Sequence, residues 1–225
     1  QRCYQARKEL EETWDFEKAL KNYPKILSFE RDIIKALNNE PENYAKALKK
    51  LPHNLLMMFI HAYQSYLFNR MICRRFEREM PLNDVVEGDI ILPADKNGLP
   101  NKDTIVDVKS NNIEKCSKMV QQGKAYISAP LFGVRTRFSE GVQGEIEREV
   151  IDEEGLIRED FIVPEISSIS STGTRREIFA PVRDIKWNLE NSGIKLSFSL
   201  NKGSYATTLL REFMKLPESE VLNYS

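Results

Sequence analysis

The chain has 225 residues, of which 41% are hydrophobic and 30% are charged, and this balance predicts a globular protein with enough apolar mass for one large domain or two small ones. No apolar run approaches the length of a membrane span, and the net charge of −1 argues mildly against a dedicated nucleic-acid-binding protein, although a local basic face is compatible with it. Three scattered cysteines and two histidines, without a CxxC pair, exclude a disulfide framework and a zinc site and favour the reducing cytoplasm.

Residues 1–80 are predicted to be helical throughout. The stretch "SFERDIIKAL" predicts a helix behind a Ser28 cap, and "NNEPENYAKALKKLP" predicts one that starts at Pro41 and stops before Pro52. A long helix is then expected from about Asn54 to Glu79. Its first half, "NLLMMFIHAY", is apolar on nearly every side, so we expect it to be buried all round, whereas the charged second half should reach the surface.

From residue 81 to residue 181 the pattern changes to mixed α/β. The stretches "DVVEGDIIL", "DTIVDV" and "KAYISAPLFG" predict strands, and "NIEKCSKMVQQG" predicts a short helix that stops at Gly123. The stretch "GEIEREVIDEEG" predicts an amphipathic helix, and we interpret the carboxylates of "IDEEG" and of the later "LPESE" as solvated helix surface. The stretch "ISSISSTGTRREIFAP" predicts a polar loop that leads into two arginines and a short strand.

The last segment carries the clearest pattern. The stretches "RDIKWNL" and "IKLSFSL" alternate apolar and polar residues on either side of an "NSG" turn, so they predict a hairpin with one buried face. The next stretch, "SLNKGSYATTLLREF", predicts a strand, a Gly-Ser corner and a helix. Together with the helical and mixed segments before it, this hairpin predicts an α+β fold.

The corner at residues 203–205 is a candidate nucleotide site. Gly203 permits an unusual backbone angle, Ser204 can cap the following helix, and Tyr205 would lie in the first helical turn, where N–H groups favour phosphate. A tyrosine there could stack on a base, which is worth ~1–3 kcal/mol. The alternative is a capped helix packed on its own hairpin, and the local pattern by itself favours this alternative.

Two further stretches hold unusual polar residues. In "AYQSYLFNRM", Gln64, Ser65 and Asn69 interrupt an otherwise buried helix, so they need partners in a neighbouring loop or in a ligand, and structural partners are favoured. In "STGTRRE", Arg175 and Arg176 follow a flexible loop, and paired arginines suit phosphate because each guanidinium can grip two oxygens. The alternative is that these are surface arginines with acidic partners.

Other arginines could extend a basic face, namely Arg74, Arg75, Arg135 and Arg137. The sequence holds no GxxxxGK[ST] phosphate loop, no GxSxG elbow and no HExxH motif. The residues by themselves therefore indicate an α+β domain with a candidate RNA-facing side.

Three stretches, "HAYQSYLFNRM", "GTRREIFAP" and "SLNKGSYATTLLREF", occur in this order and together closely resemble the TruD family of tRNA pseudouridine synthases, with the archaeal members nearest. The resemblance extends from about Ala6 to the C-terminus. It implies an enzyme that converts the uridine at position thirteen of tRNA to pseudouridine without a cofactor or a metal. It also implies a catalytic aspartate, a target base that leaves its stack, a catalytic domain with a mixed sheet, and an insertion domain that helps to enclose the RNA.

Carried over residue by residue, the resemblance makes Tyr205 the aromatic side chain that stacks on the flipped uracil. The corner around it is formed by Gly203, Ser204, Ala206 and Thr207. Arg211 and Glu212 match the closing pair of the motif, and they would hold the helix in place or contact phosphate. The Arg175–Arg176 pair matches the family's arginines near the end of the insertion domain and is an expected RNA contact.

The sequence departs from the family pattern in one respect. The family's catalytic aspartate lies in a "KDxxAxTxQ" motif, which is absent here, as is the "NYFGxQRFG" motif. The stretch "KDTIVDVK" shares Lys102 and Asp103 with the first motif but lacks the rest, so we interpret it as a decoy. We therefore expect this chain, which begins with Gln1 in mid-pattern, to be the C-terminal part of a TruD-like enzyme, with no catalytic residue of its own and no activity in isolation.

The predicted domain division places the insertion domain at residues 1–181, with 1–80 helical and 81–181 mixed α/β, and the C-terminal part of the catalytic domain at 182–225. The expected partner is tRNA, with no membrane, metal or cofactor. One alternative is a non-catalytic RNA-binding protein that kept this half of the fold. Another is a protein-interaction domain, which would not share the salt-sensitive tRNA binding that the first two predict.

Overall fold

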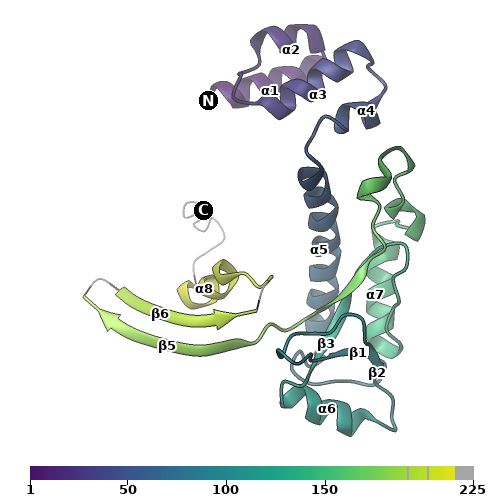
Figure 1. Ribbon diagram of the computed structural model, residues 1–225, viewed down its shortest axis with the longest axis vertical. Helices are drawn as coiled ribbons and strands as arrows, with labels where there is room; N and C mark the ends of the chain where they lie inside the picture. The colour runs from purple at the N-terminus through teal and green to yellow at the C-terminus, as the bar shows by residue number, and fades with distance from the viewer. Residues whose placement is uncertain (192, 202, 216–225) are drawn as a thin grey trace. The chain divides into compact units, whose positions relative to one another are not determined.

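A computed structural model describes residues 1–191, 193–201 and 203–215, and its elements are labelled in Figure 1. The chain divides into two compact units. The first unit comprises Gln1–Glu77 and Pro130–Arg175, and the second comprises Arg78–Ala129 and the residues from Arg176 onward. Each unit is therefore built from two separate stretches of sequence.

The first unit opens with four helices, α1 (Arg2–Thr13), α2 (Phe16–Asn22), α3 (Ser28–Asn39) and α4 (Tyr44–Leu48). Ala6, Ala19, Tyr23 and Ile34 form the small core of this bundle. Two predicted helix starts were wrong. Ser28 is the first residue of α3 rather than its cap, and α4 starts at Tyr44, where the Asn43 side chain accepts a hydrogen bond from the Lys46 backbone, rather than at Pro41.

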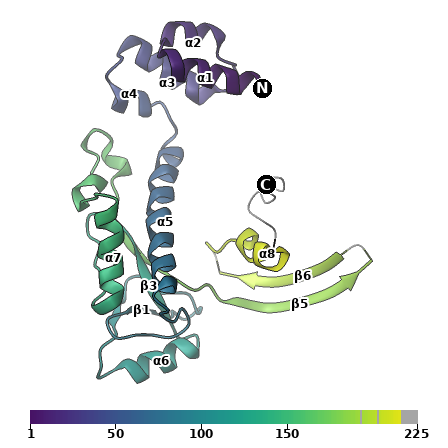
Figure 2. The same cartoon turned by 180° about the vertical axis from the view of Figure 1, so that it is seen from behind.

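The long predicted helix is α5 (His53–Glu77), and its buried side includes Leu67, Phe68 and Met71. It packs beside α7 (Gly141–Glu153), as both Figure 1 and Figure 2 show. The expectation that its first half is buried all round was wrong, since Met58 is 56% exposed and Phe59 is also exposed. The described part of the first unit covers only one side of this helix.

Two short 3₁₀ helices follow α7, η1 (Arg158–Phe161) and η2 (Pro164–Ile169), and η2 overlaps the start of the segment that was predicted to be a polar loop. Ile166 and Ile169 of η2 are buried in a core with Leu51 and Leu56. Ile166 has a non-helical backbone at a kink within η2, and its burial together with Ile169 shows how a serine-rich stretch contributes to a core.

The second unit contains most of a four-stranded sheet in the order β2-β1-β3-β4. The strands are β1 (Ile90–Pro93), β2 (Val106–Asp107), β3 (Ala125–Leu131) and β4 (Thr174–Glu177), and β1 runs antiparallel to both β2 and β3. Helix α6 (Ile113–Gln121) contributes Cys116 to a core with Ile91 and Ile127. Each predicted strand and the helix between residues 81 and 131 are present, but β1 begins only at Ile90 of "DVVEGDIIL" and β2 has two residues.

The predicted hairpin is formed by β5 (Val182–Glu190) and β6 (Gly193–Leu200), and helix α8 (Ala206–Met214) follows it. Trp187 pairs with Leu196 and Leu189 pairs with Ile194, so these apolar side chains gather on one face. The expected burial of that face was wrong, because Leu189 is 74% exposed and Trp187 and Ile194 are exposed as well. No described element forms a second layer over this part of the hairpin.

These elements confirm the predicted α+β class. Among the described residues, no helix combines the length and the apolar character needed to cross a membrane.

Candidate nucleic-acid interface

The corner between β6 and α8 is an exposed turn. The backbone N–H of Ser204 donates to the Asn201 carbonyl oxygen over 3.0 Å, and Gly203 has φ of +93°, which a side chain would strain. Tyr205 stands at the N-cap position, one residue before α8, with an extended backbone. The predicted Ser204 cap was wrong, because no described side chain caps this helix. The first turn of α8 therefore keeps N–H groups that can bind an anion.

Tyr205 is 68% exposed, so within the described structure it is not a core residue. Ala206 and Thr207 after it are exposed too, and Arg211 lies one helical turn beyond Thr207 on the same face. The structural alternative, in which Tyr205 packs between the helix and its hairpin, does not fit this placement. An exposed ring beside backbone N–H groups can stack on a base while the helix end meets a phosphate.

Arg176 connects two of the predicted motifs. Its Nη2 atom donates to the carbonyl oxygen of Gly203 over 3.0 Å, and both residues belong to the second unit. This bond brings the "GTRRE" stretch to the corner that carries Tyr205. The guanidinium therefore adds a positive charge close to the exposed ring and the start of α8.

Arg175 has a different environment from its neighbour. It is only 6% exposed, and its guanidinium donates to the Arg137 carbonyl oxygen over 2.7 Å and to Glu147 Oε1 over 3.1 Å. The fully buried Glu147 also accepts from the backbone N–H of Ser139 over 2.7 Å. Consecutive residues of a strand point to opposite faces, which explains the difference between the two arginines. RNA contact by Arg175 would require these bonds to be replaced.

The polar residues of "AYQSYLFNRM" have structural partners. Gln64 is buried, and its Nε2 atom donates to the Phe132 carbonyl oxygen over 2.7 Å and to Ser171 Oγ over 2.8 Å. Ser65 Oγ donates to the His61 carbonyl oxygen over 2.7 Å. The structural interpretation is confirmed for these two side chains.

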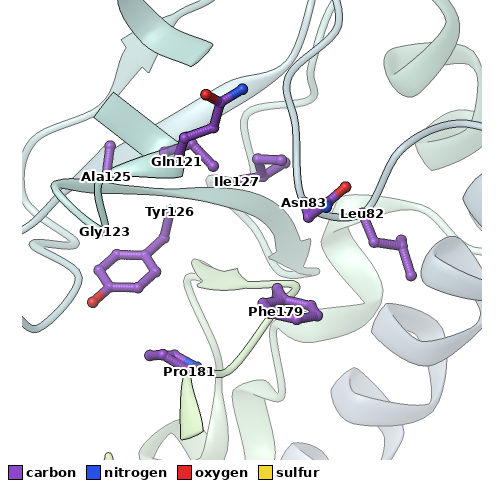
Figure 3. A pocket seen from close by; sticks show the side chains of 10 residues that line it. Leu82, Asn83, Gln121, Gly123, Ala125, Tyr126, Ile127, Phe179 and Pro181 are labelled. Carbon is purple, nitrogen blue, oxygen red and sulfur yellow. The ribbon is translucent and has the colours of Figure 1, made fainter. Parts of the chain in front are cut away.

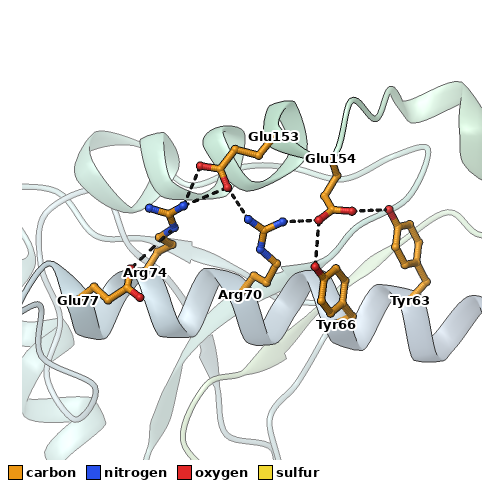
Figure 4. Close-up of polar contacts among 7 residues, drawn as sticks. All are labelled: Tyr63, Tyr66, Arg70, Arg74, Glu77, Glu153 and Glu154. Atoms are coloured by element: carbon orange, nitrogen blue, oxygen red, sulfur yellow. Dashed lines mark hydrogen bonds and ion pairs between the residues drawn. The ribbon is translucent and has the colours of Figure 1, made fainter.

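The carboxylate of Glu154, just after α7, accepts hydrogen bonds from three residues of α5, as Figure 4 shows. Tyr63 Oη donates over 3.0 Å, Tyr66 Oη donates over 3.1 Å, and Arg70 forms an ion pair with the same carboxylate. The hydrogen bond from Tyr63 lowers the pKa of Glu154. Burial, followed by the hydrogen bond to Glu154, raises the pKa of Tyr63.

Glu153 continues this network along α5. It forms ion pairs with Arg70 and with Arg74, whose Nη2 atom lies 2.8 Å from Glu153 Oε1 (Figure 4). Glu153 lies at the surface, as predicted for "IDEEG", but the prediction missed that it and Glu154 are paired with side chains of α5. The stretch "LPESE" lies outside the described residues. The sequence did contain a signal for this network, because the four residues of α5 that form it follow one another at helical spacing: Tyr63, Tyr66, Arg70 and Arg74.

Sequence reasoning also missed a hollow of about 370 Å³ in the second unit, shown in Figure 3. Tyr126, Phe179, Pro181 and Leu82 line it with apolar surface, and Tyr126 Oη donates to the Gly98 carbonyl oxygen over 2.6 Å. Among the residues that the structure describes, no cluster of His, Cys, Asp or Glu could hold a metal ion.

The chain was then compared with known proteins. A family model described as tRNA pseudouridine synthase D (TruD) matches residues 1–213. Two curated relatives carry the name "Probable tRNA pseudouridine synthase D". The one from Methanococcoides burtonii is 44% identical over 91% of this chain and 48% of its own length, and the one from Methanosarcina acetivorans is 42% identical over 94% and 49%.

The fold has a counterpart among solved structures. It is a crystal structure of a tRNA pseudouridine synthase D (TruD) from Methanosarcina mazei. The match covers 94% of this chain and 50% of the chain in that structure, with a TM-score of 0.88 and 40% sequence identity. This chain therefore belongs to the TruD family. It spans about half the length of the relatives that it matches.

Proposed function

We propose that this chain supplies the RNA-facing half of a cytoplasmic tRNA pseudouridine synthase that acts on the uridine at position thirteen, and that the nucleophilic aspartate comes from outside the chain. Membership of the TruD family supports the reaction class. The observation that carries the proposal is the exposed Tyr205 ring at a corner to which Arg176 is bonded. Ring, guanidinium and free helix end together match what an extruded nucleotide offers: a planar base and a phosphate.

The reaction defines what these residues must do. The bond from uracil N1 to ribose C1′ breaks, the uracil turns, and a bond from C5 to C1′ forms, while the proton on C5 is lost and N1 gains one. No electron is transferred to or from the substrate. The detached uracil has to be held face-on while it turns, and an aromatic ring such as Tyr205 allows rotation in the plane of the base because stacking has little directional preference.

The other corner residues have supporting roles in this proposal. Gly203 lets the backbone turn, Ser204 and Ala206 are the small residues on either side of Tyr205, and Thr207 can donate to a phosphate from the first turn of α8. Arg211, one turn later, extends the positive surface along the helix. Because Arg175 is held by buried bonds, we propose Arg176 as the phosphate contact of the pair.

The proposal includes a domain assignment. Residues 1–181 would form the insertion domain, and residues 182–225 would complete the catalytic sheet. The exposed apolar face of β5 and β6 supports this assignment, because Trp187, Leu189 and Ile194 would be withdrawn from water once the remainder of a catalytic domain packed on them.

Two measurements test the proposal. The DNA upstream of the Gln1 codon should encode a "KDxxAxTxQ" stretch, and its absence from a complete reading frame would favour a non-catalytic RNA-binding protein. A tRNA transcript should be isomerised by the complete enzyme but not by the 225-residue chain. Turnover by the chain alone would refute the claim that the nucleophile lies outside it.

A further inference from the structure

Two arginine side chains of the first unit lie over the aromatic ring of Phe138. The guanidinium carbon of Arg148 lies 5.7 Å from the centre of the Phe138 ring, and that of Arg158 lies 5.8 Å from it. The ring itself is stacked on Phe132, at 5.8 Å between ring centres. Because Phe132 is buried and holds Phe138 in place, both guanidiniums rest on a fixed support.

A hollow of about 360 Å³ lies beside these side chains. Its apolar wall is formed by Ile151, Leu156 and Ile157, of which Ile157 is 60% exposed at the rim. Asp152 and Glu159 also line it. The hollow thus combines apolar surface, two guanidiniums and two carboxylates among the residues that line it.

The two arginines differ from the glutamate-paired arginines of the first unit. Arg70, Arg74 and Arg175 are paired with glutamates, whereas neither Arg148 nor Arg158 forms an ion pair with a described residue. Arg148 makes one long hydrogen bond, from Nη2 to the Ser139 carbonyl oxygen at 3.5 Å. Most of their N–H groups therefore remain able to bind an external anion.

We propose that Arg148, Arg158 and the adjoining hollow form a binding site for one unstacked nucleotide of an RNA. The guanidiniums bind its phosphate, and the base enters the hollow against Leu156 and Ile157. Asp152 and Glu159 can accept hydrogen bonds from N–H groups on the edge of the base. The inference rests on the proposed function for the identity of the ligand as RNA, and it adds an RNA-binding position that is separate from Tyr205.

The test measures binding of a fluorescein-labelled single-stranded RNA of about twelve nucleotides to the chain by anisotropy, at several salt concentrations. The Arg148→Ala/Arg158→Ala variant should bind about tenfold or more weakly, and its salt slope should fall by about 0.7 for each phosphate that the variant no longer neutralises. The matched control is Arg2→Ala/Lys35→Ala, which removes the same charge from exposed positions in α1 and α3 of the same unit. The control should bind nearly as the parent chain does.

A second variant addresses the hollow. Ile157→Asp places a carboxylate at an exposed rim position, so the fold should be kept, which circular dichroism checks, while RNA binding should weaken by a similar factor. Equal binding by the double arginine variant and its control, or no binding by the parent chain, would overturn the inference. Isomerisation of tRNA by the complete enzyme is measured in a separate assay. Loss of the proposed activity can therefore be distinguished from loss of RNA binding at this site.

Discussion

Two regions of the molecule differ in how the sequence pattern relates to burial. One is the surroundings of helices α5 and α7, and the other is the hairpin β5–β6. Around α5 and α7, polar side chains of the first unit are buried and hydrogen-bonded, as for Gln64, Glu147 and Arg175. In the hairpin, a regular apolar pattern remains in contact with water. The polar side chains of the first region have partners within the described chain, whereas the apolar face of the hairpin is exposed among the described residues.

This difference separates residues that maintain the fold from residues that are available for recognition. Arg175 and Arg176 are neighbours in sequence, yet one is held by a buried carboxylate and the other reaches the corner of Tyr205. Substitutions in the first region should therefore change stability, while substitutions in the second should act only when RNA or the remainder of the enzyme is present. The following predictions test this distinction.

The largest effect is expected for Glu147→Ala. Removing this fully buried carboxylate breaks the buried Arg175–Glu147 ion pair, so the free energy of unfolding should fall by about 3–5 kcal/mol. Urea denaturation followed by circular dichroism measures the change. Glu11→Ala on the exposed side of α1 is the control and should stay within about 0.5 kcal/mol of the parent chain. Similar values for the two variants would contradict the importance of the buried pair.

The effect of a hairpin substitution on stability should differ between the 225-residue chain and the complete enzyme. In the 225-residue chain, Leu189→Ala should change the free energy of unfolding by less than about 0.5 kcal/mol, because the side chain is 74% exposed. In the complete enzyme the same substitution should cost about 1.5–3 kcal/mol, the worth of burying a leucine. Thermal and urea unfolding of both proteins provides the comparison. A small cost in both would show that the apolar face has no cover in the complete enzyme.

Tyr205→Ala in the complete enzyme should lower kcat/KM by roughly 5- to 150-fold, which corresponds to about 1–3 kcal/mol of lost stacking, with little change in stability. Tyr205→Phe should be mild, since stacking needs only the ring. Tritium release from a tRNA labelled at uridine C5 measures the rate. A loss of folding with unchanged activity per folded molecule would show that Tyr205 is a packing residue.

The smallest effect concerns pH. The pKa of Glu154 is lowered in the folded state, so its bonds to Tyr63, Tyr66 and Arg70 add stability above the ordinary glutamate pKa, and this stability is lost as the pH falls through the lowered value. Acid unfolding of Glu154→Gln should therefore show a weaker pH dependence than that of the parent chain between about pH 3 and pH 5. Identical pH profiles would mean that the network adds nothing to the fold.

Local pattern determined a large part of this protein. The α+β class, the hairpin, helix α6 and strand β3 follow from alternation and helical spacing within short stretches, and three motifs indicated the family that the comparisons then showed. The exposed position of Tyr205 was not predictable in this way. A tyrosine at a strand–helix corner has the same local pattern whether it packs or projects.

Only the tertiary structure decided which polar residues meet. Arg70 and Glu154 are 84 positions apart, and Gln64 and Ser171 are 107 apart, so no periodicity in either stretch reports their contact. Arg148 and Arg158 share one aromatic support and adjoin a hollow, and both features exist only after folding. Periodicity shows which side of a helix or strand is apolar. The identity of a side chain's partner depends instead on how distant elements come together, and no local sequence pattern contains that information.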